Sequence, residues 1–291
     1  MSGRDRFPVA VLSGALLLGS LLPMFGAGLH AQGGAEEADD AAEPVVIPWA
    51  AEVPFGPGER LEYDVKMGAF SVGEGVLAVE DVDTIRGHPS YHVSMSLAGG
   101  IPLARVDDYF QSWLDTELLV SRRFHQQIRE AGYESDRHYE ILSEEGRWER
   151  TDVDDGGEMI TNFPLDDISF VYYVRTLDLT PGKEYRFDRY FKEDGNPVVV
   201  QVVGNDRIEV PAGTFETVVV RPVIQTDGLF GEGGEAELHF TDDENHYLVY
   251  MRVKIPLIRS MTLHLQEIRE GREVLASTPG DEEDLGAEID E

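Results

Sequence analysis

The feature that most constrains the fold is an alternation of apolar and polar residues with a period of two, which dominates the chain after residue 59. It runs through residues 61–67 (LEYDVKM) and returns in residues 236–240, 250–255 and 261–266. Such alternation is typical of a strand that buries one face and exposes the other. We therefore expect a mainly β protein.

Short turn-forming segments separate the alternating stretches, among them RGHP, EAGY, DDGGE, EDGNP, VPAGT and TDDEN. Parallel strands need long crossover connections, so these short ones favour antiparallel pairing. We predict a large antiparallel meander that forms a curved sheet, a sandwich or a partial barrel. Pro211 fixes its own φ angle and Gly213 permits a positive one, so residues 211–214 are predicted to be a hairpin turn and not a ligand loop. Residues 151–159 (TDVDDGGEM) are likewise predicted to be a polar hairpin turn and not a calcium loop.

One segment follows a helical period instead. Four apolar residues fall at positions i, i+3, i+4 and i+7, namely Phe170, Tyr173, Val174 and Leu177. Asp166 or Asp167 is suited to cap the start of a helix here. We predict that residues 167–177 form the one substantial helix of the domain and pack their apolar stripe on the sheet. Arg175 lies off this stripe, and we expect its guanidinium to reach solvent, a carboxylate or an anionic ligand.

The two ends of the chain differ in composition from the middle. Arg4 and Arg6 precede an apolar run that ends near Ala31 and is too short to span a bilayer, which is the layout of a cleavable signal peptide. We divide the chain into a signal peptide (1–31), an acidic disordered linker (32–53), a single β-rich domain (54–270) and an acidic disordered tail (271–291). The expected location is the periplasm, with secretion also open, and no transmembrane segment after cleavage.

Charge and cysteine content exclude several classes of protein. The chain has 24 Lys and Arg against 56 Asp and Glu, a net charge of −32, which repels nucleic acid and anionic lipid surfaces. It has no cysteine, which excludes disulfides, thiolate metal sites and cysteine nucleophiles. The domain must therefore be stabilised by its core.

No motif assigns a reaction. The sequence contains neither a GxSxG elbow nor an HExxH run, so we predict no catalytic residue, no metal ligand and no cofactor, and we expect the histidines on the surface. Asp107 and Asp108 are neighbours on a predicted strand, so they point to opposite faces and cannot form a carboxylate pair. Aromatic residues crowd around the predicted helix, where they line an apolar pocket or plug one end of the sheet. The residues chosen as binding candidates are Arg105, Tyr109, Tyr172 and Arg175.

Four stretches together resemble domain-of-unknown-function family 3108 of bacterial envelope proteins. They are VPFGPGERLEYDVKMGAFSVGEGVLAV, DDISFVYYVRTLDLTPGKEYRFDRYF, IEVPAGTFETVVVRP and TLHLQEI, and the likeness spans about residues 54–268. The resemblance implies export in a diderm bacterium and a β-rich fold. It implies no activity and no catalytic residues.

Three functions fit these observations. We expect a non-enzymatic binding or scaffolding protein of the envelope, whose partner is a lipid, a lipoprotein or an envelope polymer. The first alternative is a hydrolase of envelope polysaccharide or peptide that uses acids such as Asp107 or Asp108. The second is an assembly factor that pairs through an exposed edge strand. The sequence decides neither the ligand nor the oligomeric state.

Overall fold

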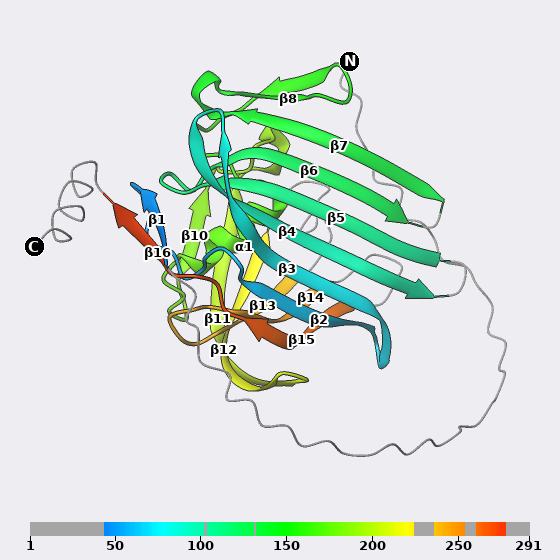
Figure 1. Ribbon diagram of the computed structural model, residues 1–291. Coiled ribbons are helices and arrows are strands. Elements are labelled where there is room, and N and C mark those ends of the chain that lie inside the picture. The colour runs from blue at the N-terminus through cyan, green and yellow to red at the C-terminus, as the bar shows by residue number, and fades with distance from the viewer. Residues whose placement is uncertain (1–43, 102–103, 131, 224–235, 254–259, 278–291) are drawn as a thin grey trace, which may run out of the picture.

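The computed structural model describes residues 44–277 apart from 102–103, 131, 224–235 and 254–259. These residues form a 14-stranded sheet, a small two-stranded sheet and one α-helix (Figure 1). The strands are β1 (Val45–Pro48), β2 (Arg60–Met67), β3 (Phe70–Ile85), β4 (His88–Ile101), β5 (Ala104–Asp115), β6 (Ser121–Glu130), β7 (Tyr133–Leu142), β8 (Arg147–Arg150), β9 (Asp155–Glu158), β10 (Glu184–Phe187), β11 (Val198–Val210), β12 (Gly213–Val223), β13 (Ala236–Thr241), β14 (Leu248–Val253), β15 (Met261–Arg269) and β16 (Val274–Ser277). The helix is α1 (Asp167–Arg175), and Ser143–Glu145 and Glu193–Gly195 form short 3-10 turns.

The large sheet consists of two antiparallel meanders that are joined in its middle by the pairing of β2 with β15. Its order is β10-β11-β12-β13-β14-β15-β2-β3-β4-β5-β6-β7-β8-β9, with antiparallel pairs throughout. The first and last long strands are thus neighbours, and the sheet has two arms that end at the edge strands β9 and β10. The predicted fold class is confirmed. Of the alternatives left open, the structure shows one curved sheet that does not close into a barrel.

The alternation of apolar and polar residues explains the strands, and irregularities in strand pairing explain the curvature. In β2 the alternation places Leu61, Tyr63 and Val65 in the core, with 0%, 1% and 6% of their surface exposed. Register shifts interrupt several strand pairs, for example between Val65 and Lys66 of β2. Because a bulge bends its strand and increases the local twist, these shifts let the sheet curl around its own apolar face.

The predicted turns are confirmed. β11 and β12 pair up to Val210 and Gly213, so Pro211 and Ala212 form the hairpin turn. Residues 151–154 form the turn between β8 and β9.

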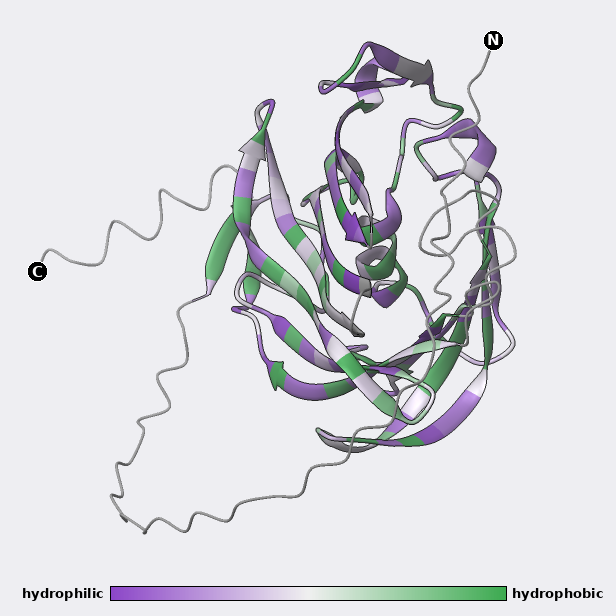
Figure 2. Ribbon diagram, turned by 90° about the vertical axis from the view of Figure 1, so that its right-hand side faces the viewer, coloured by the Kyte–Doolittle hydropathy of each residue, from purple (hydrophilic) through white to green (hydrophobic). Residues whose placement is uncertain are grey.

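The helix α1 lies in the hollow of the curved sheet, which corrects one expectation (Figure 2). We predicted that one apolar stripe of the helix packs on the sheet and that Arg175 lies off this stripe. Instead every residue of α1 is buried except Tyr173, which is half-buried. Phe170 and Val174 are in the core as predicted, whereas Leu177 lies beyond the end of the helix and is only half-buried. A helix enclosed by a sheet needs apolar residues on all sides, so the stripe described only part of its buried surface.

The small sheet joins the two ends of the described chain. β1 and β16 pair in parallel, with Val45 opposite Val274 and Pro48 opposite Ser277. Residues 45–48 and 274–277 were expected to belong to the disordered linker (32–53) and tail (271–291), and here they are strands. The signal peptide (1–31) lies outside the described residues, and the division of the chain into segments stays a prediction. In the described part of the chain, no helix is long and apolar enough to cross a membrane.

Candidate functional site

A buried ion pair holds the C-terminal end of α1. Arg175 is 1% exposed, and its Nη1 and Nη2 donate to Glu59 Oε1 and Oε2 at 2.5 and 2.9 Å. Nη2 also donates to the carbonyl oxygens of Pro54 (3.1 Å) and Asn245 (3.0 Å). Of the three partners that we expected for Arg175, the structure shows a carboxylate. The pair is shielded from water and connects the end of α1 to the residue that precedes β2.

Aromatic rings surround this guanidinium. Its central carbon lies 5.3 Å from the ring centre of Phe55, 5.6 Å from that of Tyr172 and 5.5 Å from that of Tyr247. Tyr172 is fully buried, and burial raises the pKa of its hydroxyl well above the usual value. No described residue forms a hydrogen bond with that hydroxyl. Tyr172 and Arg175 therefore lie in the core and offer no surface to a ligand in solution.

The N-terminal end of α1 is held by a network of serines. Asp166 Oδ1 accepts hydrogen bonds from the backbone N–H groups of Ile168 (2.9 Å) and Ser169 (3.0 Å), which is the predicted cap. Its Oδ2 accepts one from the hydroxyl of Ser112 on β5 (2.6 Å), and the hydroxyls of Ser121 and Ser169 lie 2.6 Å apart. This polar network ties α1 to β5 and β6.

The neighbouring acid, Asp167, is buried without a close cation. Burial, together with the negative charge of Asp166, raises the pKa of its carboxyl to about 7 against the opposing effects of Lys192 and Tyr190. The nearest described hydrogen-bond donor is the Tyr190 hydroxyl, 3.5 Å away. Because this raised pKa lies near neutrality, we expect the stability of the N-terminal end of α1 to depend on pH.

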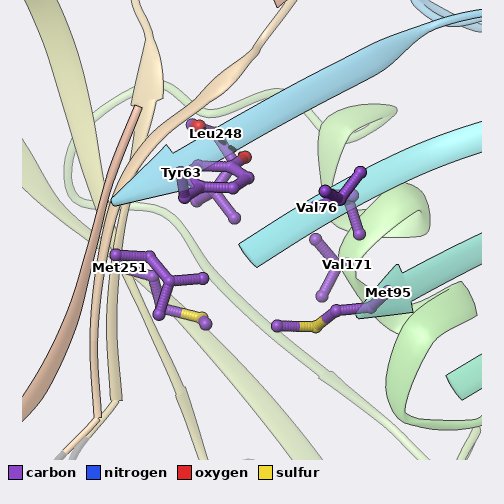
Figure 3. Close-up of a pocket in the computed structure, with 8 residues that line it drawn as sticks. Tyr63, Val76, Met95, Val171, Leu248 and Met251 are labelled. Atoms are coloured by element: carbon purple, nitrogen blue, oxygen red, sulfur yellow. Dashed lines mark hydrogen bonds between the residues drawn. The ribbon is translucent and has the colours of Figure 1, made fainter. Parts of the chain in front are cut away.

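An apolar cavity lies between α1 and the sheet (Figure 3). Its lining consists of Tyr63, Val76, Leu77, Met95, Val171, Leu248, Met251 and Leu263. None of these side chains is charged, and the Tyr63 hydroxyl donates to Leu248 O at 2.8 Å. The space inside is about 10 Å³, enough for about one water molecule. A larger ligand therefore fits only after side chains such as Met95 and Met251 move.

The aromatic residues after α1 act as a plug. The ring of Phe191 lies 5.2–6.3 Å from the rings of Tyr190, Tyr139, Trp148 and Phe124. Tyr190 and Phe191 are 5% and 1% exposed. They fill the space beside β6, β7 and β8, so the plug interpretation holds for these two residues.

The other two binding candidates lie on the outer face of β5, opposite the core. Arg105 is exposed and Tyr109 is half-buried. The four chosen residues thus do not form one site, because the sheet separates Arg105 and Tyr109 from Tyr172 and Arg175.

The predicted separation of the two aspartates on β5 is confirmed. The side chain of Asp107 is 67% exposed, whereas Asp108 is 6% exposed on the core face. Burial raises the pKa of Asp108 to about 6, against a hydrogen bond from the backbone N–H of Arg129 at 3.0 Å. These two acids cannot act on one substrate bond.

A row of polar side chains crosses the outer face from β4 to β7. His92 Nε2 lies 2.9 Å from Gln111 Oε1, and Gln111 Nε2 lies 3.1 Å from His125 Nδ1. His125 Nε2 lies 2.6 Å from Asp136 Oδ1, and His138 Nε2 lies 3.0 Å from the same oxygen. We call these five residues the outer histidine row. Figure 1 shows the strands that carry it side by side.

Sequence reasoning did not find this row, although a signal was present. The predicted turn at EAGY implies that Glu130 pairs with Tyr133, and counting back along both strands places His125 opposite His138, as observed. A different histidine corrects our expectation of surface histidines: His239 is only 3% exposed, because Thr217, Glu237 and Tyr250 pack around its ring.

Comparison with solved structures finds distant likenesses. One is to a β-barrel-like protein of domain of unknown function DUF1849 from Brucella abortus, with 11% identity and a TM-score of 0.46, covering 75% of this chain and 99% of that chain. Another is to a hypothetical protein from Chlamydia trachomatis, with 9% identity and a TM-score of 0.35, covering 77% and 91%. Neither likeness bears on function. A search of curated proteins finds no significant match.

Comparison with protein families is decisive. The family described as protein of unknown function DUF3108 matches residues 62–265, from β2 to β15. This match covers more than half of the 291 residues and includes α1, so the resemblance predicted from the sequence is confirmed. The chain belongs to the DUF3108 family of proteins of unknown function.

Proposed function

We propose that this chain is an exported binding protein of the cell envelope that takes up the apolar chain of a lipid between α1 and the sheet. The observation that carries this proposal is the cavity between the helix and strands β2–β4 and β14–β15, whose lining has no charged side chain. Small-molecule sites in proteins are in general concave and mostly apolar. The export and the periplasmic location rest on the sequence of residues 1–31.

Two features of the fold support an expandable site. Met95 and Met251 are unbranched, and methionine adapts its shape to what it contacts. The edge strands β9 and β10 end the two arms of the sheet without pairing with each other, and α1 lies inside the curve. The hollow can therefore widen by a shift of α1 without breaking a strand pair. The acidic surface disfavours adhesion to anionic bilayers, which suits a protein that carries a lipid through the aqueous space.

The two alternatives receive less support. Asp107 and Asp108 lie on opposite faces of β5, which removes the acid pair that motivated a hydrolase. Both edge strands of the large sheet are only four residues long, and short edges are a feature that opposes pairing with other chains.

The test is ligand content and exchange. Native mass spectrometry of the protein purified from its own envelope should show a lipid adduct, and a fluorescent fatty acid should exchange into the protein. Val171→Phe, which adds volume to the cavity wall, should weaken fatty-acid binding at least tenfold.

A matched control separates the cavity from the rest of the core. Met95→Ala and Met251→Ala enlarge the cavity and should alter affinity, whereas Met159→Ala, at a buried methionine that does not line it, should leave affinity unchanged. Thermal melts verify that each variant is folded. Bare apoprotein together with no exchange of fatty acid would refute the proposal.

A further inference from the structure

The outer histidine row ends in a compact set of metal-type donors. His125 and His138 are directly opposite each other on β6 and β7, and their rings stack at 3.8 Å with an angle of 22° between the planes. Asp136 lies two residues before His138, so it shares the same face of β7. One donor atom from each of the three lies within 4.8 Å of the other two. Donors around a tetrahedral zinc ion are about 3.3 Å apart, so this set is close to the required size.

We propose that His125, Asp136 and His138 bind a divalent transition-metal ion of the zinc class on the outer face of the sheet. Two imidazoles and one carboxylate are a donor set that suits zinc and copper, while calcium and magnesium prefer all-oxygen ligands. The side chains of Asp136 and His138 are 54% and 46% exposed, which leaves the remaining coordination positions open to water or to another ligand.

The rest of the row supplies a second layer around the ion. His125 binds metal through Nε2 when its ring proton resides on Nδ1, where it needs an acceptor. Gln111 lies 3.1 Å from Nδ1, and turning its amide by 180° presents the carbonyl oxygen to that proton. The amide NH₂ then faces Nε2 of His92, which accepts. Such hydrogen bonds orient the ligand ring and raise its basicity.

Charge also favours a cation at this place. Asp136 supplies a carboxylate to the three donors. The chain as a whole carries a net charge of −32, which raises the local concentration of cations. This site lies on the face opposite the lipid cavity, so the inference does not depend on the proposed function.

The chain offers a matched control at His88. Its Nδ1 lies 3.6 Å from Asp115 Oδ2, and its Nε2 lies 3.7 Å from Glu144 Oε1, so it also stands beside two acids. Arg122 is hydrogen-bonded to both acids, and its Nη2 lies 3.2 Å from the His88 Nδ1. Because the guanidinium already neutralises these carboxylates, His88 should not hold a metal ion.

The experiment is a titration of the protein, free of any histidine tag, with ZnCl₂ and CuCl₂ by calorimetry. We expect one Zn²⁺ per chain, with tighter binding of Cu²⁺. His138→Ala should weaken Zn²⁺ binding at least tenfold, and Gln111→Ala about tenfold through the lost second layer. His88→Ala should leave the affinity unchanged.

Three outcomes would overturn the inference. The first is no saturable Zn²⁺ or Cu²⁺ binding to the folded protein. The second is unchanged affinity in His138→Ala, or in His138→Gln if the alanine variant melts early. The third is equal binding of Mg²⁺, which would show a general attraction of cations to an acidic surface.

Discussion

Replacing Arg175 by methionine should destabilise the fold rather than affect binding alone. The sequence placed Arg175 off the predicted apolar stripe, with its guanidinium expected to reach solvent, a carboxylate or an anionic ligand. In the structure its side chain is 0% exposed and that of Glu59 is 1% exposed. Arg175→Met retains most of the aliphatic stem and removes the charge, so Glu59 remains as a buried carboxylate without its partner.

The magnitude follows from the burial of the pair. Breaking a buried ion pair by removing one partner costs about 3–5 kcal/mol, because the remaining charge stays out of water. Two carbonyl oxygens, of Pro54 and Asn245, also lose their donor. We therefore expect a loss of about 4–5 kcal/mol of unfolding free energy, a large fraction of the roughly 5–15 kcal/mol of an ordinary domain.

The assay is urea unfolding followed by tryptophan fluorescence, together with thermal melting. The melting temperature should fall by roughly 10–15 °C for a domain of this size. A double variant, Glu59→Leu with Arg175→Met, replaces both charges by apolar groups and should recover a large part of the loss. A loss below about 1 kcal/mol in Arg175→Met, or no recovery in the double variant, would refute the view that this pair secures α1.

Three further variants test how α1 is packed and how its N-terminal end responds to pH. Val174→Asp places a charge in a fully buried position and should unfold the domain, whereas Val174→Ala should cost about 1–3 kcal/mol; an unchanged circular-dichroism melt of Val174→Asp would contradict the packing of α1. Asp167 has a folded pKa raised from 3.8 to about 7, so the folded state binds the proton more tightly and stability is lost as pH rises from about 4 to 7. Asp167→Asn should therefore stabilise the protein at pH 8 by about 2–4 kcal/mol and have little effect at pH 4. Thermal melts at the two pH values measure this difference, and equal effects at both would contradict the raised pKa of Asp167.

The periodic part of the fold could be predicted from the sequence because strand alternation and turn chemistry are local. The run from Leu61 to Met67, the turn at Pro211 and Ala212 and the cap at Asp166 all depend on residues close in the chain. Partners far apart could not be found in this way. Glu59 and Arg175 are 116 positions apart, and the local pattern of neither segment indicates that the two residues pair.

The burial of α1 on all sides could not be predicted from the sequence either. The spacing of Phe170 and Val174 correctly indicated a helix, but the number of its faces that are buried depends on how far the sheet curls. That curl is set by register shifts such as the one in β2, and a single sequence carries no clear signal for them. The histidine pair differs, since the tight turn after Glu130 and the strand period together imply it.

The two proposed sites lie on opposite faces of one sheet, which determines how they should influence each other. On the core face, the neighbours of His125 and His138 are Phe124 and Tyr139, which pack around Phe191 in the aromatic plug. An ion that ties β6 to β7 would stiffen this arm of the sheet. The apolar cavity is lined by β2–β4, β14, β15 and α1, so its walls lie outside the β6–β7 pair. Zn²⁺ should therefore raise the melting temperature while the affinity for fatty acid stays constant. A change in that affinity would show that the two sites are coupled through α1, whose N-terminal end is hydrogen-bonded to serines of β5 and β6.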